Sequence, residues 1–253
     1  MAKVIAIANQ KGGVGKTTTS INLSASLAQM EQRVLIVDCD PQGNATSGFG
    51  ISSSTVTQNI YDVLINNLHP RYTLQMTNFG VTVLPANIHL AGAEIELVPM
   101  IARETKLRLA LDKIRSDFDY IIIDCPPSLG LLTLNGLAAA DAVIIPMQCE
   151  FYSLEGVTQL LNTVEIVRGS INPLLFIEGV VMTMYDGRTK HHKQVIEEVR
   201  EVLGYLVYDT IIPRQVKLSE AASYGTPIIA YDKNSRSAKA YLNLAKEVIE
   251  RGK

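Results

Sequence analysis

The sequence lacks the features that would place the chain in a membrane or outside the cell. No apolar run reaches the roughly 18 residues that a transmembrane helix needs. No charged segment followed by an apolar one opens the chain, so we expect no signal peptide. Internal repeats, low-complexity tracts and linkers are also missing. We therefore expect one cytoplasmic domain that spans residues 1–253.

Cysteine is scarce, with only three residues in 253. Cys39, Cys125 and Cys149 are widely spaced, share no metal-ligand spacing, and each lies at or just after an apolar run. An odd count at such spacing argues against a disulfide framework. We predict reduced thiols in or near the core.

The chain also lacks a strong charge of either sign, because its formal net charge is −2. The whole molecule therefore has no basic field that would attract nucleic acid. The distribution is uneven, however. Residues 1–184 carry 11 Lys and Arg against 16 Asp and Glu, whereas residues 185–239 carry 9 against 7, with His191 and His192 beside them. The last third of the chain is where a local basic surface could form.

Apolar runs rich in β-branched residues alternate with helical patterns along the chain. The runs are continuous, which is typical of parallel strands covered on both faces. We expect strands at 4–8, 33–38, 81–84, 120–124, 142–146, 176–182 and 206–212. Helices are expected near 15–30, 90–116, 128–139, 154–169, 190–203 and 236–251, with Pro99 dividing the second. This rhythm predicts an α/β fold with a doubly wound, mainly parallel sheet flanked by helices. Its functional residues should lie at the carboxyl ends of the strands.

A glycine-rich stretch joins the first expected strand to the first expected helix. Glycines allow backbone N–H groups to close around phosphate oxygens, and the helix N-terminus adds further donors. Lys16 is placed for the β- and γ-phosphates, and the Thr17 hydroxyl for Mg²⁺. This order of strand, loop and helix is that of a P-loop NTPase. The expected nucleotide-binding residues are Lys11, Gly12, Gly13, Val14, Gly15, Lys16, Thr17 and Thr18.

The loop departs from the ordinary P-loop pattern, because Gln10 replaces its first glycine and Lys11 is added. In this it resembles the deviant Walker A motif of the ParA/MinD group of P-loop ATPases. Further segments resemble the chromosomal ParA branch, often called Soj, and the resemblance covers nearly the whole chain. They lie at residues 40–46, 124–129, 150–156, 184–189 and 212–221. Because the chain starts at its first strand, we expect no extra N-terminal DNA-binding domain of the kind found in some plasmid relatives.

Carboxylates follow two of the expected strands. An Asp after a run of Ile is costly to bury unless it faces a cation, a polar cluster or solvent. A strand-terminal cap explains Asp124 alone equally well, but beside a phosphate loop we assign Asp124 to Mg²⁺, through water. The resemblance implies that Asp40 positions or activates the attacking water. It also implies that Asp38 supports the loop and the outer metal shell, and that residues 124–128 form switch II, which moves with the γ-phosphate.

The resemblance further implies an ATPase that forms a homodimer when ATP is bound. In this family Lys11 crosses the dimer and touches the partner's phosphates, so Lys11, Lys16 and Asp40 are the expected catalytic residues. Pro213, Arg214 and Gln215 are expected to contact the base and ribose. Gln215 and Lys217 stand where the family more often has Asn and Arg, and Lys lacks the bidentate fork of Arg.

The same resemblance implies non-specific binding of double-stranded DNA in the ATP state. The expected DNA contacts are Arg188 and Lys217, with Arg214 and Arg236 as weaker candidates. Hydrolysis would be slow alone and stimulated by a ParB/Spo0J-type centromere-binding protein. The expected role is chromosome or plasmid partitioning at the nucleoid, with ATP and Mg²⁺ as cofactors and no membrane partner.

Two alternatives remain open at this point. A MinD-like membrane regulator of the division site needs a basic amphipathic C-terminal helix as an anchor. Here the apolar face of that helix carries Tyr241, Leu244, Ala245, Val248 and Ile249, and its other charges balance, which favours docking on the core. An iron–sulfur relative of the nitrogenase iron-protein kind needs a cysteine that bridges a cluster across a dimer, and Cys125 is the candidate.

Overall fold

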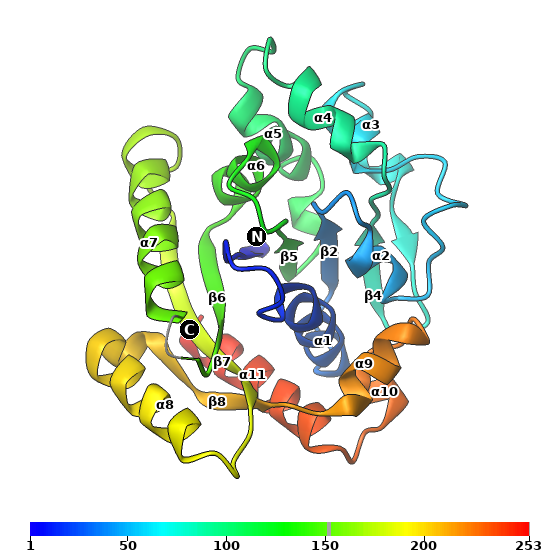
Figure 1. Cartoon of the computed structure of the whole chain (residues 1–253). Coiled ribbons are helices and arrows are strands. Elements are labelled where there is room, and N and C mark those ends of the chain that lie inside the picture. The colour runs from blue at the N-terminus through cyan, green and yellow to red at the C-terminus, as the bar shows by residue number, and fades with distance from the viewer. Residues whose placement is uncertain (151–152, 253) are drawn as a thin grey trace.

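The structure is a computed structural model that describes residues 1–150 and 153–252. Its strands form one sheet in the order β3-β4-β2-β5-β1-β6-β7-β8 (Figure 1). All neighbouring strands are parallel except β3 and β4, which confirms the predicted mainly parallel sheet. The strands are β1 (Lys3–Ile7), β2 (Val34–Asp38), β3 (Gln75–Met76), β4 (Val81–Leu84), β5 (Tyr120–Asp124), β6 (Ala142–Gln148), β7 (Phe176–Tyr185) and β8 (Val207–Pro213).

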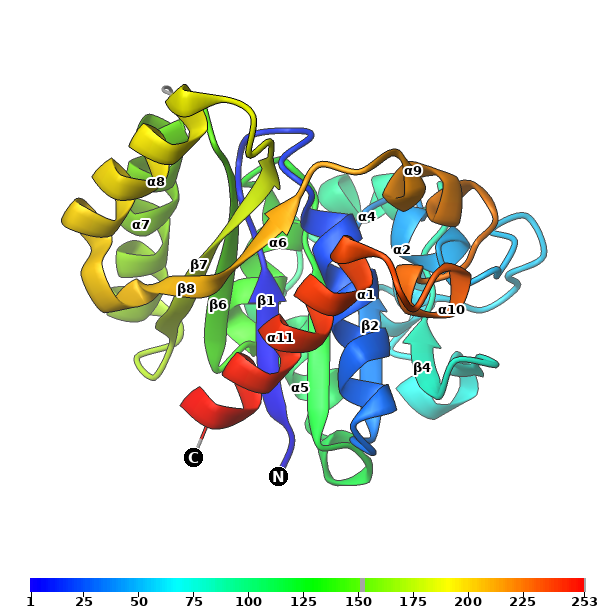
Figure 2. The same ribbon diagram turned by 90° about the horizontal axis from the view of Figure 1, so that it is seen from below.

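Helices cover both faces of this sheet (Figure 2). They are α1 (Lys16–Gln29), α2 (Asn44–Ser47), α3 (Ile60–Leu64), α4 (Leu90–Glu96), α5 (Lys106–Leu111), α6 (Leu131–Ala139), α7 (Ser153–Ser170), α8 (Lys190–Leu203), α9 (Val216–Ser223), α10 (Ile228–Tyr231) and α11 (Arg236–Arg251). Short 3₁₀ turns lie at Pro70–Tyr72, Arg103–Thr105, Arg115–Asp117 and Gly204–Leu206.

The central strand β1 shows why helices cover both faces of the sheet. Successive side chains of a strand point to opposite faces. Val4 and Ala6 belong to a core with Leu132 of α6, whereas Ile5 and Ile7 belong to a second core with Leu244 of α11. In Figure 2, α1 and α11 lie together on one side of the strands. The predicted doubly wound architecture is confirmed.

The differences from the predicted elements are confined to short segments. Pro99 interrupts the helical pattern as predicted, since α4 ends at Glu96 and α5 begins only at Lys106. The helix expected from residue 128 begins at Leu131. Five elements do not follow from the sequence pattern, and they have between two and eight residues: β3, α2, α3, α9 and α10. Segments of that length are too short to show a periodic pattern.

The C-terminal helix α11 docks on the core as predicted. Tyr241, Leu244, Ala245 and Val248 are buried, and α11 packs along α1 and β8. Among the described residues, no helix combines the length and apolarity required to cross a membrane.

All three cysteines are free and buried, as predicted. Burial raises the pKa of the Cys149 thiol to about 12, and the pKa values of Cys39 and Cys125 also rise through burial. A thiol with a raised pKa is a poor nucleophile, so these residues fill space in the core.

Candidate functional site

Three neighbouring strands end together at the carboxyl edge of the sheet. In the sheet register Asp124 of β5 lies opposite Ile7 of β1 on one side and opposite Asp38 of β2 on the other. The loop after β1 is the glycine-rich stretch. Strand order therefore brings this loop, Asp38 and Asp124 to one place, although they are far apart in the sequence.

The glycine-rich loop has the backbone that phosphate binding requires. Gly13 and Gly15 adopt φ angles of 75° and 89°, a left-handed conformation that favours glycine, and Gly15 is the N-cap of α1. Lys16 is buried, and its Nζ donates a hydrogen bond to the carbonyl oxygen of Lys11 at 3.2 Å. The lysine side chain thus folds back over the loop, where phosphate oxygens would replace the carbonyl.

Polar side chains of β6 and β7 donate hydrogen bonds to backbone carbonyl oxygens of the glycine-rich loop. Gln148 Nε2 donates to the carbonyl of Gly13 at 2.9 Å, and Thr183 Oγ1 donates to that of Val14 at 2.9 Å. Asn9 links the loop to β6, since its Nδ2 donates to the Pro146 carbonyl at 2.7 Å. These three residues are not among those predicted from the sequence. The sequence feature that could have indicated them is a polar residue within, or directly after, an apolar run that forms a strand.

Asp124 carries an unsatisfied carboxylate oxygen. Its Oδ1 accepts a hydrogen bond from Ser20 Oγ at 2.8 Å, whereas its buried Oδ2 has no partner among the described residues. Burial and the nearby charge of Asp38 raise the pKa of Asp124 to about 7, although the Ser20 and Thr17 hydroxyls oppose this shift. An unpaired carboxylate oxygen beside the first turn of α1, which carries Thr17, suits a hydrated Mg²⁺ ion. The residues present therefore fit the expected metal.

Asp38 organises the loop that follows β2. Its Oδ2 accepts hydrogen bonds from the Thr46 backbone N at 2.8 Å and from Thr46 Oγ1 at 2.7 Å. Its Oδ1 accepts one from the Asp40 backbone N at 3.1 Å. These bonds lower the pKa of Asp38, but complete burial outweighs them and raises it to about 6. The support role expected of Asp38 matches these contacts.

Asp40 is half-buried and lies close enough to Lys16 for its charge to affect the pKa of the lysine. Burial lowers the pKa of Lys16, whereas the charges of Asp124 and Asp40 oppose that shift. The Asp40 carboxylate accepts one local hydrogen bond, from the Gln42 backbone N at 2.9 Å. The expected catalytic pair of Lys16 and Asp40 thus lies in one neighbourhood with Asp124.

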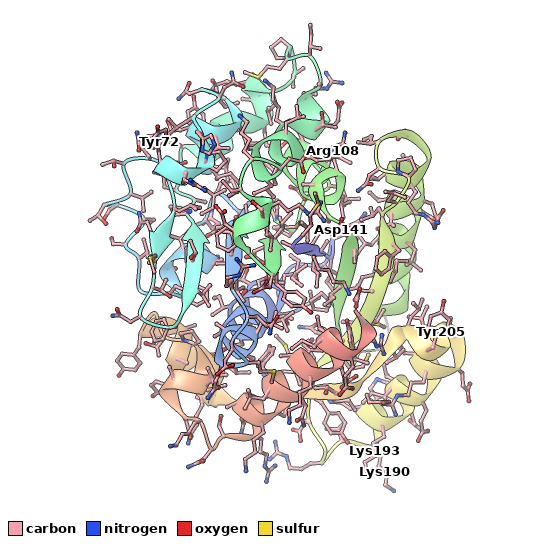
Figure 3. All side chains as sticks on the ribbon, turned by 180° about the vertical axis from the view of Figure 1, so that it is seen from behind. Tyr72, Arg108, Asp141, Lys190, Lys193 and Tyr205 are labelled. Atoms are coloured by element: carbon pink, nitrogen blue, oxygen red, sulfur yellow. The ribbon has the colours of Figure 1, made fainter. Side chains whose placement is uncertain are left out.

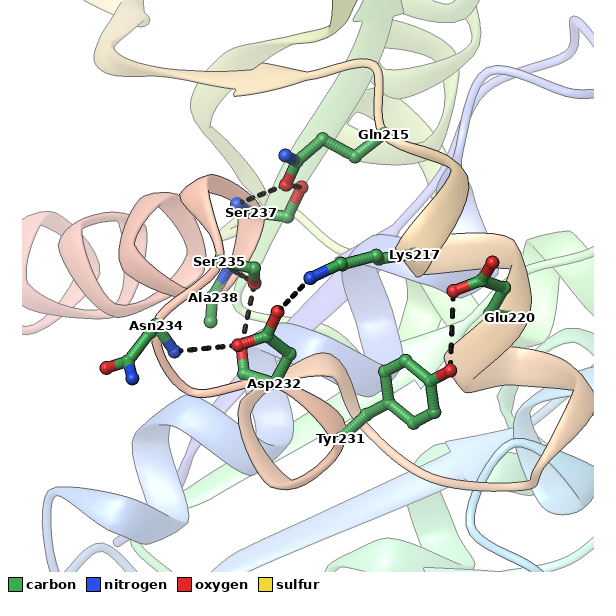
Figure 4. Close-up of polar contacts among 9 residues, drawn as sticks. All are labelled: Gln215, Lys217, Glu220, Tyr231, Asp232, Asn234, Ser235, Ser237 and Ala238. Carbon is green, nitrogen blue, oxygen red and sulfur yellow. Dashed lines mark hydrogen bonds and ion pairs between the residues drawn. The ribbon is translucent and has the colours of Figure 1, made fainter.

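A pocket of about 1210 Å³ opens beside the loop, larger than the roughly 300–1,000 Å³ of most ligand sites. Gly15 and Thr18 line its loop side, and Pro213, Arg214 and Gln215 line its far side. Gln215 Oε1 accepts hydrogen bonds from Ser237 N at 2.8 Å and Ser237 Oγ at 2.7 Å, as Figure 4 shows. The amide oxygen thus ties the pocket wall to α11.

Lys11 does not extend away from its own chain. Its Nζ lies 2.7 Å from Glu150 Oε2, just after β6, in a partly exposed ion pair. Glu150 begins the segment 150–156 of the resemblance, in which Phe151 and Tyr152 lie outside the described residues. The side chain expected to reach a partner subunit is therefore held by an intrachain contact here.

The expected DNA contacts lie on the exposed surface, and two of them, Arg188 and Lys217, form ion pairs. The Arg188 guanidinium, whose side chain is 90% exposed, makes two short contacts with the Asp186 carboxylate, and this lowers the pKa of Asp186. Lys217 Nζ contacts Asp232, as drawn in Figure 4. Arg214 and Arg236 are exposed and line the pocket.

Two further lysines stand next to Arg188. Lys190 and Lys193 belong to the first turn of α8, directly after the Arg188 loop, and both are exposed. Figure 3 shows them reaching outward at the edge of the molecule. They enlarge the basic surface that the charge distribution of the sequence indicated.

Cys125 is unsuited to an iron–sulfur cluster at a dimer face. Its side chain is buried at 1% exposure. Its Sγ packs under α6, where a Cβ added at Gly136 would approach it to 2.9 Å. A thiol enclosed by the core of its own chain cannot reach a cluster shared with a second subunit.

Comparison with known proteins identifies the family. Residues 2–177 match the family described as AAA domain. The chain is 58% identical to the sporulation initiation inhibitor protein Soj of Bacillus subtilis over 253 residues, which covers both chains fully. It is 52% identical to the chromosome partitioning protein ParA of Myxococcus xanthus, over 99% of this chain and 89% of that one.

Solved structures agree with this family in fold. The structure described as cobyrinic acid a,c-diamide synthase from Mycobacterium smegmatis, with bound ADP and magnesium, is similar to this one with a TM-score of 0.88. The two are 41% identical over 100% of this chain and 96% of that one. The P-loop, the sheet order around it and these relatives together show that the chain belongs to the ParA/Soj family of partitioning ATPases.

Proposed function

We propose that this chain is a switch that dimerises on ATP, binds DNA non-specifically in that state, and is reset by hydrolysis during partitioning. One observation carries the proposal. Lys16, Asp40 and the unpaired oxygen of Asp124 meet at the carboxyl edge of the sheet, beside a pocket that extends to Arg188. The partitioning relatives also have higher identities, 58% and 52%, than the mycobacterial protein named for amide synthesis, at 41%.

ATP would bind with its phosphates in the loop and its base in the large pocket. The N–H groups of residues 12–18 and the Lys16 ammonium would bind the phosphates. Thr17 and, through water, Asp124 would hold Mg²⁺, which neutralises charge on the phosphates when bound. Pro213, Arg214 and Gln215 would contact the base and ribose.

Asp40 would position the water that attacks the γ-phosphate. It stands on a loop that Asp38 fixes through Thr46. A carboxylate on an organised loop can orient water without being consumed. Because Asp38 is occupied with these loop contacts, it would act on the metal shell only indirectly.

Dimerisation would transfer Lys11 from Glu150 to the partner's phosphates. The Lys11–Glu150 pair is 38% and 57% exposed, and exposed ion pairs contribute only about 0.2–1 kcal/mol. The triphosphate of ATP carries more negative charge than one carboxylate. ATP would therefore favour the exchange, and Lys11 would supply positive charge in trans as an arginine finger does.

DNA binding would follow from dimerisation, because the chain has a net charge of −2. A monomer would contact only a few DNA phosphates, since its candidate cations Arg188 and Lys217 are paired with Asp186 and Asp232. Two copies double the number of phosphates that can be contacted, and affinity rises steeply with that number. Contacts from these residues, with Arg214 and Arg236, would fall on the phosphate backbone and give no sequence preference.

A ParB-type protein would stimulate hydrolysis. The excess of acidic residues in positions 1–184 suits a basic segment of such a partner. Binding to DNA would place the protein at the nucleoid. Steady-state hydrolysis with and without the partner peptide, in the presence of DNA, measures this stimulation.

The proposed function is tested by DNA co-sedimentation with ATP, with ADP and without nucleotide. The wild-type protein should bind DNA only when ATP is present. The Lys16→Ala protein, which lacks the phosphate-binding ammonium, should not bind DNA in any of the three states. Equal sedimentation in all three nucleotide states would contradict the proposal. Liposome flotation with ATP examines the MinD-like alternative, which the docking of α11 on the core disfavours.

A further inference from the structure

Helix α6, which follows β5 and the expected switch II residues, has no side-chain cap of its own. Residues 125–130 join β5 to α6, and the N-cap residue Gly130 offers no side chain to the first N–H groups of the helix. Those donors are bonded instead by a residue of α4. Leu131 N donates to Glu94 Oε2 at 3.0 Å, and Leu132 N donates to Glu94 Oε1 at 3.3 Å. A carboxylate at this position satisfies orphan donors and faces the positive end of the helix dipole.

The absence of a side chain at Gly130 leaves the space in which the Glu94 carboxylate lies. The φ angle of Gly130 is −78°, a value that any residue adopts, so backbone conformation does not require glycine. The Glu94 carboxylate does require the space, because an added Cβ would lie 2.4 Å from Glu94 Oε1 and 2.6 Å from Oε2 and would push the carboxylate out of its present place. Glycine at 130 leaves the room that Glu94 fills.

The segment that Glu94 anchors begins directly after Asp124, the expected metal residue. Its first residue, Cys125, is held by a hydrogen bond from its backbone N to the Ile7 carbonyl at 3.2 Å. Its end is held by α6, since Thr133 Oγ1 donates to the Ser128 carbonyl at 2.6 Å. Between these points Pro127 and Ser128 are exposed. Their position therefore depends on where α6 begins, which Glu94 fixes.

The helix that carries Glu94 is also tied to the loop of Asp40. Thr46 Oγ1, which donates to Asp38, accepts a hydrogen bond from Ala86 N at 2.9 Å, four residues before α4 begins. Leu90 and Ala93 anchor α4 in the core. The short path from Asp38 through Thr46 and α4 to Glu94 thus connects the loop after β2 with the segment after β5.

We infer that Glu94 is a positioning residue for ATP hydrolysis. It fixes the N-terminus of α6, sets the position of residues 125–130, and links that segment to the loop of Asp40. The inference rests on the proposed ATPase function. Glu94 contacts no phosphate-binding residue, so its loss should change turnover and leave ATP affinity intact.

The first experiment compares Glu94→Gln with Glu96→Gln. Glu96 lies on the same helix but is exposed and bonds the Tyr61 hydroxyl, so it is the matched control. For Glu94→Gln we expect ATP affinity to stay within about twofold while kcat falls about tenfold, since a 1 Å misplacement can cost about 10²-fold. Glu96→Gln should behave as wild type. Wild-type kcat in Glu94→Gln, or an equal loss in affinity, would overturn the inference.

The second experiment is a double-mutant cycle. Gly130→Ala should lower kcat as Glu94→Ala does, because its methyl group displaces the carboxylate. In the Glu94→Ala background the same methyl group meets no carboxylate, so the double variant should match Glu94→Ala. This non-additivity identifies contact between the two sites. Additive losses would show that the two residues act separately and would overturn the assignment.

Amide hydrogen exchange without nucleotide separates this inference from the proposed function. Exchange at Leu131 and Leu132 should accelerate about tenfold in Glu94→Gln, the effect of weakening one charged hydrogen bond. Unchanged exchange would overturn the assignment of Glu94. If the wild-type protein bound no ATP and hydrolysed none, the proposed function would fall, whereas accelerated exchange would still support the anchoring of α6.

Discussion

Lys11 and Glu150 form an ion pair of 2.7 Å that spans the glycine-rich loop and the end of β6 within one chain. This contact holds the loop lysine in the free protein. Dimerisation of the proposed kind must break it. The pair therefore opposes assembly by the small free energy of an exposed ion pair.

Removing the acceptor should favour the dimer. Glu150→Gln releases Lys11 in both copies, so we expect the ATP-dependent dimer to form at a protein concentration up to about thirtyfold lower, the equivalent of about 1 kcal/mol for each of the two pairs. Light scattering with ATP measures the protein concentration at which the dimer forms. Lys11→Ala should stay monomeric, and Arg168→Ala, which breaks an exposed pair with Glu165 on α7, is the control. A Glu150→Gln protein that dimerised less readily than wild type would contradict this prediction.

Asp40→Ala should leave ATP bound and nearly stop its hydrolysis. The carboxylate is expected to orient the attacking water, and a positioned base contributes about 10²–10⁴-fold in rate. Phosphate release should therefore fall by at least about 10²-fold, and the protein should accumulate as an ATP-bound dimer. Asp112→Ala changes an exposed carboxylate of the segment after α5 and should hydrolyse ATP normally. Normal turnover in Asp40→Ala would exclude the proposed role.

The nucleotide-free protein should lose stability as pH rises from about 4 to about 6. Burial raises the pKa of Asp38 to about 6 from an ordinary 3.8, so the folded state retains a proton that the unfolded chain has released. Stability is greatest below the unfolded value and decreases until pH passes the folded value, by about 2–3 kcal/mol.

Urea unfolding between pH 4 and 8 measures this effect. Asp38→Asn carries no titrating group at this position, so its stability should change less across the same window. Asp124, with a pKa raised to about 7, contributes a decrease of the same sign that continues above pH 6 in both proteins. Identical pH profiles for wild type and Asp38→Asn would contradict the assignment of the shift to Asp38.

Arg188→Glu should abolish DNA binding while ATP binding and dimerisation persist. The substitution replaces an exposed cation with an anion next to Asp186 and repels the DNA backbone. Gel shift of random DNA with ATP measures the loss, and the wild-type affinity should fall sharply with salt. Arg168→Glu makes the same change of charge on α7 and should bind normally. A shift of random DNA by the Arg188→Glu, Lys217→Glu protein would place the binding surface elsewhere.

The sequence by itself determined the layout of the fold. Continuous apolar runs such as Tyr120–Asp124 can only be buried, and a run covered on both faces belongs in the middle of a parallel sheet. The glycine-rich loop predicted a phosphate site because its backbone conformation depends on residue type alone. The apolar face of α11 predicted docking on the core, since Tyr241, Leu244 and Val248 recur at helical spacing.

Only the tertiary structure decided which distant side chains meet. Residues 9, 148 and 183 hold the loop because β6 and β7 follow β1 in the sheet order, which no local pattern contains. The ion-pair partners of Lys11, Arg188 and Lys217 could not be predicted from the sequence either, because many carboxylates could pair with each cation. Glu94 is the clearest case. Its sequence neighbours show an ordinary helix, and its role follows from the packing of α4 against the uncapped start of α6.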